Sequence, residues 1–142
     1  MSEDQGLQVQ ADRLCFVCGP DNPAGLQARL FTDAEEGSAW CELTLDQRFQ
    51  GWQGVIHGGI LATLLDEVAI YACRTRGEQF VTSGIHVRYR KPVPVDSLIR
   101  VQGRILEQRR RIFRVLTQVE IAGECCAEAE VQVMRLGNHG KR

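Results

Sequence analysis

The sequence lacks a long hydrophobic run, an excess of charge and an internal repeat. Its most apolar stretch, residues 60–72, is interrupted by Asp66 and Glu67 and is too short to span a bilayer. Seventeen Lys and Arg residues against eighteen Asp and Glu give a formal net charge of −1, which excludes the strongly basic surface of a dedicated nucleic-acid-binding protein. With 44% apolar and 25% charged residues in 142, the sequence predicts one globular domain with neither a membrane nor a nucleic acid as partner.

The sequence also lacks a recognisable export signal and a complete metal-binding motif. No basic patch followed by an apolar run opens the chain, so we expect a cytoplasmic protein whose six cysteines are reduced thiols. Cys15-Phe-Val-Cys18 has the spacing of half a zinc site. The other half is missing, because Cys125 and Cys126 are adjacent and no spaced His pair follows them. The pair therefore favours a tight turn, and we expect no metal.

The remaining pattern predicts an α+β fold. We expect one domain over residues 13–136, with loose ends at 1–12 and 137–142. A helix is predicted over residues 58–76, ended by Gly77, and a loop over 46–55 precedes it. The predicted strands cover residues 26–32, 38–44, 80–91, 98–107, 110–121 and 124–136. Two strands, one long helix and four further strands suggest an antiparallel sheet wrapped around the helix.

Asp66 stands out on the predicted helix. The apolar stripe consists of Ile60, Leu61, Leu64, Leu65, Val68, Ala69 and Ala72. Asp66 points away from this stripe and shares its face with Gly59, Ala62 and Ile70, which are not the residues of a solvated surface. We therefore expect Asp66 in a specific pocket. Glu67, about 100° further round the helix, is the better candidate for an ordinary surface charge.

Gly58 and Gly59 open the predicted helix. The free backbone N–H groups and the positive end of the helix dipole at such a start form a natural site for an oxyanion or a phosphate, although a merely glycine-softened helix entry is the alternative. Gly59 and Asp66 are separated by a rise of about 10.5 Å, too far to act on one carbonyl group within one chain. If both act on one substrate, the site must combine Gly59 of one subunit with Asp66 of another, as a two-fold dimer does twice.

The stretch Gly54-Val-Ile-His57-Gly58-Gly59-Ile-Leu-Ala-Thr-Leu-Leu-Asp66-Glu67 resembles the signature of hotdog-fold acyl-CoA thioesterases of the phenylacetate-pathway type, and of their mammalian superfamily members. Upstream, Cys15-Phe-Val-Cys18-Gly19 and Asn22-Pro23-Ala-Gly25-Leu26 resemble the leader of many bacterial members. The likeness runs from about Cys15 to Met134. It implies a hydrolase for thioesters of coenzyme A that uses no cofactor.

The resemblance also implies roles for individual residues. Asp66 is the catalytic carboxylate, and the Gly59 N–H is the oxyanion donor, with His57 and Gly58 shaping the turn. Thr82, sixteen residues after Asp66, helps to place the water or the carboxylate, unless it is a strand residue chosen for β propensity. Many relatives have Asn or Gln six residues before the His, where this chain has Gly51. Gln50 or Gln53 replaces that amide only if the loop is shaped differently.

These groups suffice chemically, because a thiolate with a thiol pKa of about 8.5 leaves without a strong general acid. The carboxylate either activates water or attacks to form a mixed anhydride, and the sequence does not separate the two routes.

Candidate groups for the coenzyme A phosphates are arginines. Arg88 and Arg90 project from one face of a predicted strand, and Arg111 belongs to the cluster of the next hairpin, regions that in the family lie near the phosphate end of coenzyme A. Arginine matches phosphate through its bidentate geometry, whereas a solvated, positive sheet edge is the alternative.

Two other functions remain open. One is a catalytically inactive acyl-CoA-binding dimer, for which Gly51 is the best argument, and the other is an acyl-thioester dehydratase or hydratase. The expected partners are an acyl-CoA substrate and further copies of the chain, as a dimer or a dimer of dimers. We expect His86, His139 and Cys73 to be incidental to catalysis. The acyl group is not specified by the sequence.

Overall fold

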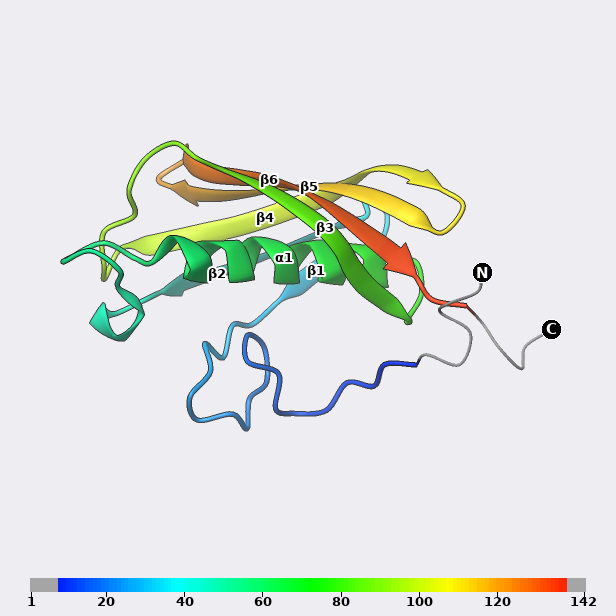
Figure 1. Cartoon of the computed structure of the whole chain (residues 1–142), viewed down its shortest axis with the longest axis horizontal. Coiled ribbons are helices and arrows are strands. Elements are labelled where there is room, and N and C mark those ends of the chain that lie inside the picture. The colour runs from blue at the N-terminus through cyan, green and yellow to red at the C-terminus, as the bar shows by residue number, and fades with distance from the viewer. Residues whose placement is uncertain (1–7, 138–142) are drawn as a thin grey trace.

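The computed structural model describes residues 8–137, which form one α-helix and six β-strands (Figure 1). The elements in chain order are β1 (Phe31–Asp33), β2 (Ser38–Thr44), the short 3-10 helix η1 (Gln47–Phe49), α1 (Gly58–Arg74), β3 (Phe80–Tyr89), β4 (Leu98–Arg109), β5 (Ile112–Ile121) and β6 (Glu124–Arg135). His139 and most of both expected loose ends lie outside the described residues.

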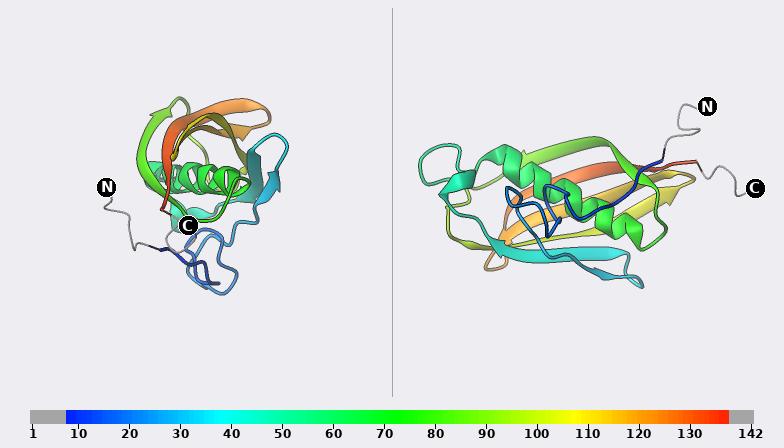
Figure 2. Two further views of the ribbon diagram at one scale, coloured as in Figure 1. Left: turned by 90° about the vertical axis from the view of Figure 1, so that its right-hand side faces the viewer. Right: turned by 90° about the horizontal axis from the view of Figure 1, so that it is seen from below.

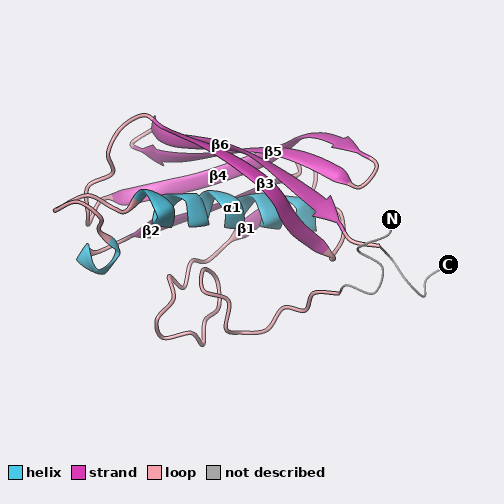
Figure 3. Ribbon diagram, in the orientation of Figure 1, coloured by secondary structure: helices cyan, strands magenta, loops and turns pink. Residues whose placement is uncertain are grey.

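The strands form one antiparallel sheet in the order β1-β2-β4-β5-β6-β3. Viewed along the helix, the sheet curves around α1, and the segment before β1 lies on the side that the sheet leaves open (Figure 2). This segment has neither helix nor strand over residues 8–30 (Figure 3). The predicted α+β fold, the hotdog arrangement of a sheet around one long helix, is therefore confirmed.

The core lies between α1 and the concave face of the sheet. The helix buries the predicted stripe together with Cys73, although Ile60 is only half-buried. Gly103 in β4 allows the close approach of the two layers, because a Cβ there would lie 2.5 Å from Thr117 Cγ2 and 3.2 Å from Val68 Cγ1. Burying each of the large apolar side chains of the stripe contributes about 1.5–3 kcal/mol.

Two elements have bounds that differ from the predicted ones. The strand expected over residues 26–32 is reduced to β1, because Leu26 and Ala28 donate their N–H groups to carbonyls of the preceding segment and Gln27 has a φ of 51°. The helix ends at Arg74 and not at residue 76, because the Thr75 hydroxyl and N–H both donate to the carbonyl of Ala72.

The strand β3 contains a bulge that changes which side chains face the helix. Thr82 pairs with Val133 and Gly84 with Gln132, so Ser83 is an extra residue in the ladder with β6. A bulge of one residue reverses the alternation of a strand beyond it. Thr82 and Tyr89 are seven positions apart and would face opposite sides of a regular strand, yet both contact α1.

No helix in the described part of the chain is both long and apolar enough to cross a bilayer. All six cysteines are free thiols.

Candidate active site

His57 caps the start of α1. Its Nδ1 accepts a hydrogen bond from the Gly59 N–H at 2.8 Å, while its carbonyl accepts from Ile60 at 3.0 Å. A neutral imidazole that accepts through Nδ1 carries its proton on Nε2. The Gly59 N–H, expected to be a free donor, is thus already engaged, and any oxyanion must take the place of the imidazole nitrogen.

Tyr89 contacts the carbonyl of the peptide group that joins Gly58 and Gly59. Its hydroxyl donates to the Gly58 carbonyl at 2.7 Å, and that carbonyl belongs to the peptide whose N–H is Gly59. A hydrogen bond donated to a peptide carbonyl polarises the group and strengthens its N–H as a donor. Tyr89 is a further candidate site residue. The sequence did not reveal it, because the bulge that turns it toward the helix is not visible in the pattern of apolar and polar residues.

Asp66 lies half-buried in the middle of α1, with Thr82 of β3 beside it. The Thr82 hydroxyl donates to Asp66 Oδ1 at 2.6 Å, a distance typical of a charge-assisted hydrogen bond. The structure therefore brings together the two residues that the resemblance paired, and the carboxylate is not on an open solvent face.

Glu67 is not the surface charge that the helix pattern predicted. It is half-buried, and the Cys15 thiol donates to its Oε2 at 3.6 Å. Sequence periodicity missed this contact because the segment that covers Glu67 lies 52 residues earlier in the chain.

The loop before the helix is packed closely around His57. A Cβ on Gly51 would lie 3.3 Å from the Cα and from the Cδ2 of His57, so the loop approaches the imidazole more closely than most side chains allow. Gln50 Oε1 accepts the Gly54 N–H at 3.0 Å and is committed within the loop. Gln53 is exposed, and Trp52, 87% exposed, lines the hollow beside His57 and Gly58.

The expected phosphate-binding arginines differ in their surroundings. Arg88 lies on β3, whereas Arg90 follows the end of that strand, so the two do not share a strand face as predicted. Arg90 departs because its N–H donates to the Cys126 carbonyl, and its side chain pairs with Glu128 at 2.8 Å. Arg90 lines a hollow with Gly58 and Tyr89. Arg111 donates to the Arg135 carbonyl at 3.1 Å.

The other candidates fit incidental roles. Burial raises the pKa of the Cys73 thiol to about 12, so this thiol stays protonated at neutral pH and packs in the core. His86 is exposed on β3.

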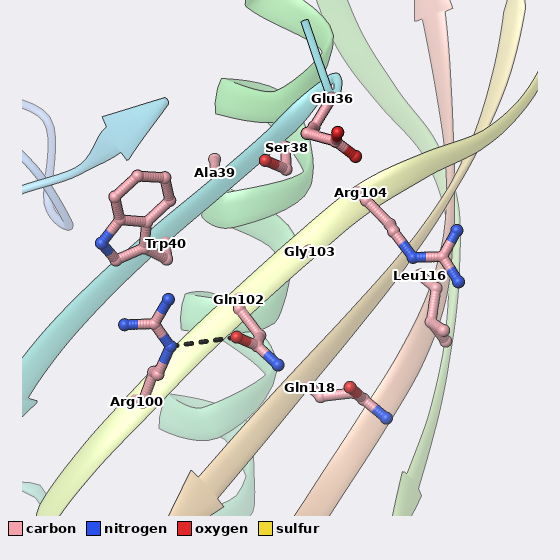
Figure 4. A pocket seen from close by; sticks show the side chains of 10 residues that line it. All are labelled: Glu36, Ser38, Ala39, Trp40, Arg100, Gln102, Gly103, Arg104, Leu116 and Gln118. Atoms are coloured by element: carbon pink, nitrogen blue, oxygen red, sulfur yellow. Dashed lines mark hydrogen bonds between the residues drawn. The ribbon is translucent and has the colours of Figure 1, made fainter. Parts of the chain in front are cut away.

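A separate groove crosses the outer face of β2, β4 and β5 (Figure 4). Arg100 and Gln102 lie on its floor, joined by a hydrogen bond of 3.0 Å, and the Arg100 guanidinium lies 5.5 Å from the centre of the Trp40 ring. The helix lies behind the strands in this view, and none of the predicted site residues lines the groove.

Comparison with known proteins gives consistent matches. Residues 53–127 match the family model described as the thioesterase superfamily. Human acyl-coenzyme A thioesterase 13 is 26% identical over 110 residues, which cover 76% of this chain and 74% of that protein. Bovine acyl-coenzyme A thioesterase THEM4 is 27% identical over 101 residues, 68% of this chain but only 41% of that protein. The chain thus aligns with less than half of THEM4.

A crystal structure described as a thioesterase superfamily protein superposes with a TM-score of 0.80 at 28% identity. The superposition covers 86% of this chain and 60% of the other.

Proposed function

This chain belongs to the thioesterase superfamily, and from that membership we propose that it hydrolyses the thioester of an acyl- or aryl-coenzyme A to the free acid and coenzyme A. The observation that carries the proposal is the half-buried Asp66 carboxylate, held at 2.6 Å by the Thr82 hydroxyl on the face of α1 away from the core. A carboxylate fixed in this way suits a general base or a nucleophile.

Thr82 engages one carboxylate oxygen and so sets the direction of the other. In our proposal that second oxygen of Asp66 either takes the proton of an attacking water or itself attacks the thioester carbonyl carbon. The C–S bond then breaks and coenzyme A leaves as a thiolate, which needs no strong acid because its conjugate thiol has a pKa of about 8.5. In the first route the proton on Asp66 passes to the thiolate or to solvent, and in the second a water molecule hydrolyses the mixed anhydride, which releases the acid and restores the carboxylate.

The oxyanion that develops on the carbonyl is assigned to the Gly59 N–H. The substrate oxygen replaces His57 Nδ1 as the acceptor, while the hydroxyl of Tyr89 keeps the Gly58–Gly59 peptide in place. Tyr89 is thus a positioning residue, acting through the peptide and not on the substrate. The Gly59 N–H is held in place before reaction, so the only rearrangement that this step requires is displacement of the His57 imidazole.

The proposed site is shared between two subunits, because Gly59 and Asp66 of one helix are separated by a rise of about 10.5 Å. Strand β3 supports this arrangement, because it lies at the edge of the sheet and exposes Ile85 and Tyr89, 42% and 53% respectively. Pairing of β3 with the same strand of a second copy would bring the two helices side by side in opposite directions.

Three arginines are proposed to bind the coenzyme A phosphates, Arg88 and Arg90 near the end of β3 and Arg111 at the opposite end of the sheet. Arg88 is exposed, and Arg90 beside the Gly58 hollow would exchange Glu128 for a phosphate. Arg111, whose Nε donates to the Arg135 carbonyl, is the third arginine of this proposal.

The first test is thiol release from aryl-, short-chain and long-chain acyl-CoA by wild type and Asp66→Asn. We expect a fall in kcat of about 10²–10⁴ with acyl-CoA binding retained, because only the proton transfer or nucleophilic attack is lost. Equal rates would exclude Asp66. Binding without turnover by either protein would establish the inactive acyl-CoA-binding alternative. A changed acyl chain without thiol release would indicate a dehydratase or hydratase.

A subunit-mixing experiment tests the shared site. Gly59→Pro removes the proposed oxyanion donor, so homodimers of this variant and of Asp66→Asn should both be inactive. Mixed dimers contain one site with both native groups, and random mixing of equal amounts should restore about a quarter of wild-type activity. No recovery, although exchange is confirmed by mass spectrometry, would contradict a site shared in this way.

The role of Thr82 is tested with the adjacent Ser83 as a control. Thr82→Val removes the hydroxyl that contacts Asp66 and should lower kcat about fivefold to tenfold, the loss expected for one hydrogen bond. Ser83→Ala removes a hydroxyl that donates to the Gln132 carbonyl and should leave kcat unchanged. Thr82→Ser should recover most of the activity, and equal effects of Thr82→Val and Ser83→Ala would argue for a purely structural role.

The variant Tyr89→Phe should lower kcat with little change in KM. Loss of the hydroxyl leaves the ring in place but frees the Gly58 carbonyl, so we expect kcat to fall about fivefold with KM changed less than twofold. Thermal unfolding of the variant controls for damage to the fold. A fall in stability with unchanged kcat would show that Tyr89 supports only the structure.

A further inference from the structure

The turn from Cys15 to Gly19 holds one sulfur in a ring of backbone donors. Cys15 Sγ accepts hydrogen bonds from the N–H groups of Val17 at 3.3 Å and Cys18 at 3.4 Å, while the Cys15 carbonyl accepts the Gly19 N–H at 2.9 Å. A Cβ on Gly19 would lie 2.4 Å from the Cys15 nitrogen, so the turn requires glycine at that position. These contacts fix the position of the Cys15 sulfur relative to Cys18.

The helix adds a third possible metal ligand beside the two cysteines of this turn. Glu67 of α1 places a carboxylate oxygen 3.6 Å from Cys15 Sγ, and the ligand atoms of Cys15, Cys18 and Glu67 all lie within 4.8 Å of one another. With Zn–S of about 2.3 Å and Zn–O of about 2.1 Å, a tetrahedral zinc ion separates sulfur and oxygen ligands by about 3.6 Å. The Cys15 and Glu67 ligand atoms already have this spacing, and the Cys18 sulfur lies within 4.8 Å of both.

The cluster carries negative charge that protein cations do not neutralise. Between residues 8 and 137, no Lys or Arg forms an ion pair with Glu67. The Arg74 guanidinium lies instead over the Tyr71 ring, 4.9 Å from its centre. A bound divalent cation would offset the charge of the Glu67 carboxylate.

We propose that Cys15, Cys18 and Glu67 bind a zinc ion that fastens the N-terminal turn to α1. The fourth position opens onto the groove between residues 9–13 and the helix, where a water molecule completes the tetrahedron. The ion is structural and takes no part in the proposed hydrolysis, because Asp66 points about 100° away from Glu67 around the helix. This site stands independently of the proposed thioesterase activity.

The experiment measures zinc and cobalt binding by the fully reduced, full-length chain after removal of metal with a chelator. We expect one equivalent of Zn²⁺ to bind and to raise the thermal unfolding temperature. Co²⁺ in its place should show thiolate-to-cobalt charge transfer and the visible bands of a tetrahedral site. Binding releases thiol protons, so the apparent affinity should rise with pH.

Single variants identify the ligands. Cys15→Ser, Cys18→Ser and Glu67→Gln should each weaken zinc binding by about 100-fold or more, whereas Cys125→Ser, a half-buried thiol outside the cluster, should bind like wild type. Circular dichroism of the metal-free variants shows whether each one is folded.

Three results would overturn the proposal. They are the absence of stoichiometric binding by the reduced wild type, equal binding by folded ligand variants and Cys125→Ser, and a Cys15–Cys18 disulfide that persists under reducing conditions. None of them bears on thiol release from acyl-CoA, so failure of this proposal is distinguishable from failure of the proposed function.

Discussion

Two hydrogen bonds near opposite ends of β3 determine how the edge of the sheet meets the helix. Thr82 donates to Asp66 in the middle of α1, and Tyr89 donates to Gly58 at its start. Both depend on the extra residue Ser83, because without this bulge the seven positions between Thr82 and Tyr89 would turn one of them outward. A single irregularity in the ladder thus holds both the carboxylate and the peptide of the proposed site.

The sequence predicts the helix and most strands because their signals are local. The start of α1 at Gly58, the bounds of β2 and the Ala122-Gly123 turn follow from glycine placement and alternation. The Asp66 face was also predictable, because a carboxylate among small and apolar residues is unusual on a solvated helix. Alternation does not reveal the bulge: it places Val81, Val87 and Tyr89 on one face and Thr82 on the other. The contact of Thr82 with Asp66 could be expected only from the family resemblance.

Long-range packing explains what local patterns missed on the other side of the helix. The apolar residues at 26–30 read as a strand, yet the N–H groups of Leu26 and Ala28 donate to Phe16 and Val17. This pairing fixes the N-terminal segment across the open side of α1 and brings Cys15 to Glu67. No sequence motif relates a Cys-x-x-Cys pair to a helical carboxylate 49 residues later. The proximity of Cys15, Cys18 and Glu67 is therefore apparent only in the folded chain.

Asp66 and Glu67 are adjacent in sequence but contact different parts of the chain, since a helix rotates about 100° per residue. Asp66 faces β3, and Glu67 faces the N-terminal turn. The separation keeps the proposed zinc ion away from the proposed catalytic carboxylate, although Asp66 and Glu67 belong to the same turn of α1. The N-terminal segment and the edge strand β3 are therefore attached to α1 through adjacent residues, so the two proposed sites can be tested separately although they belong to one helix.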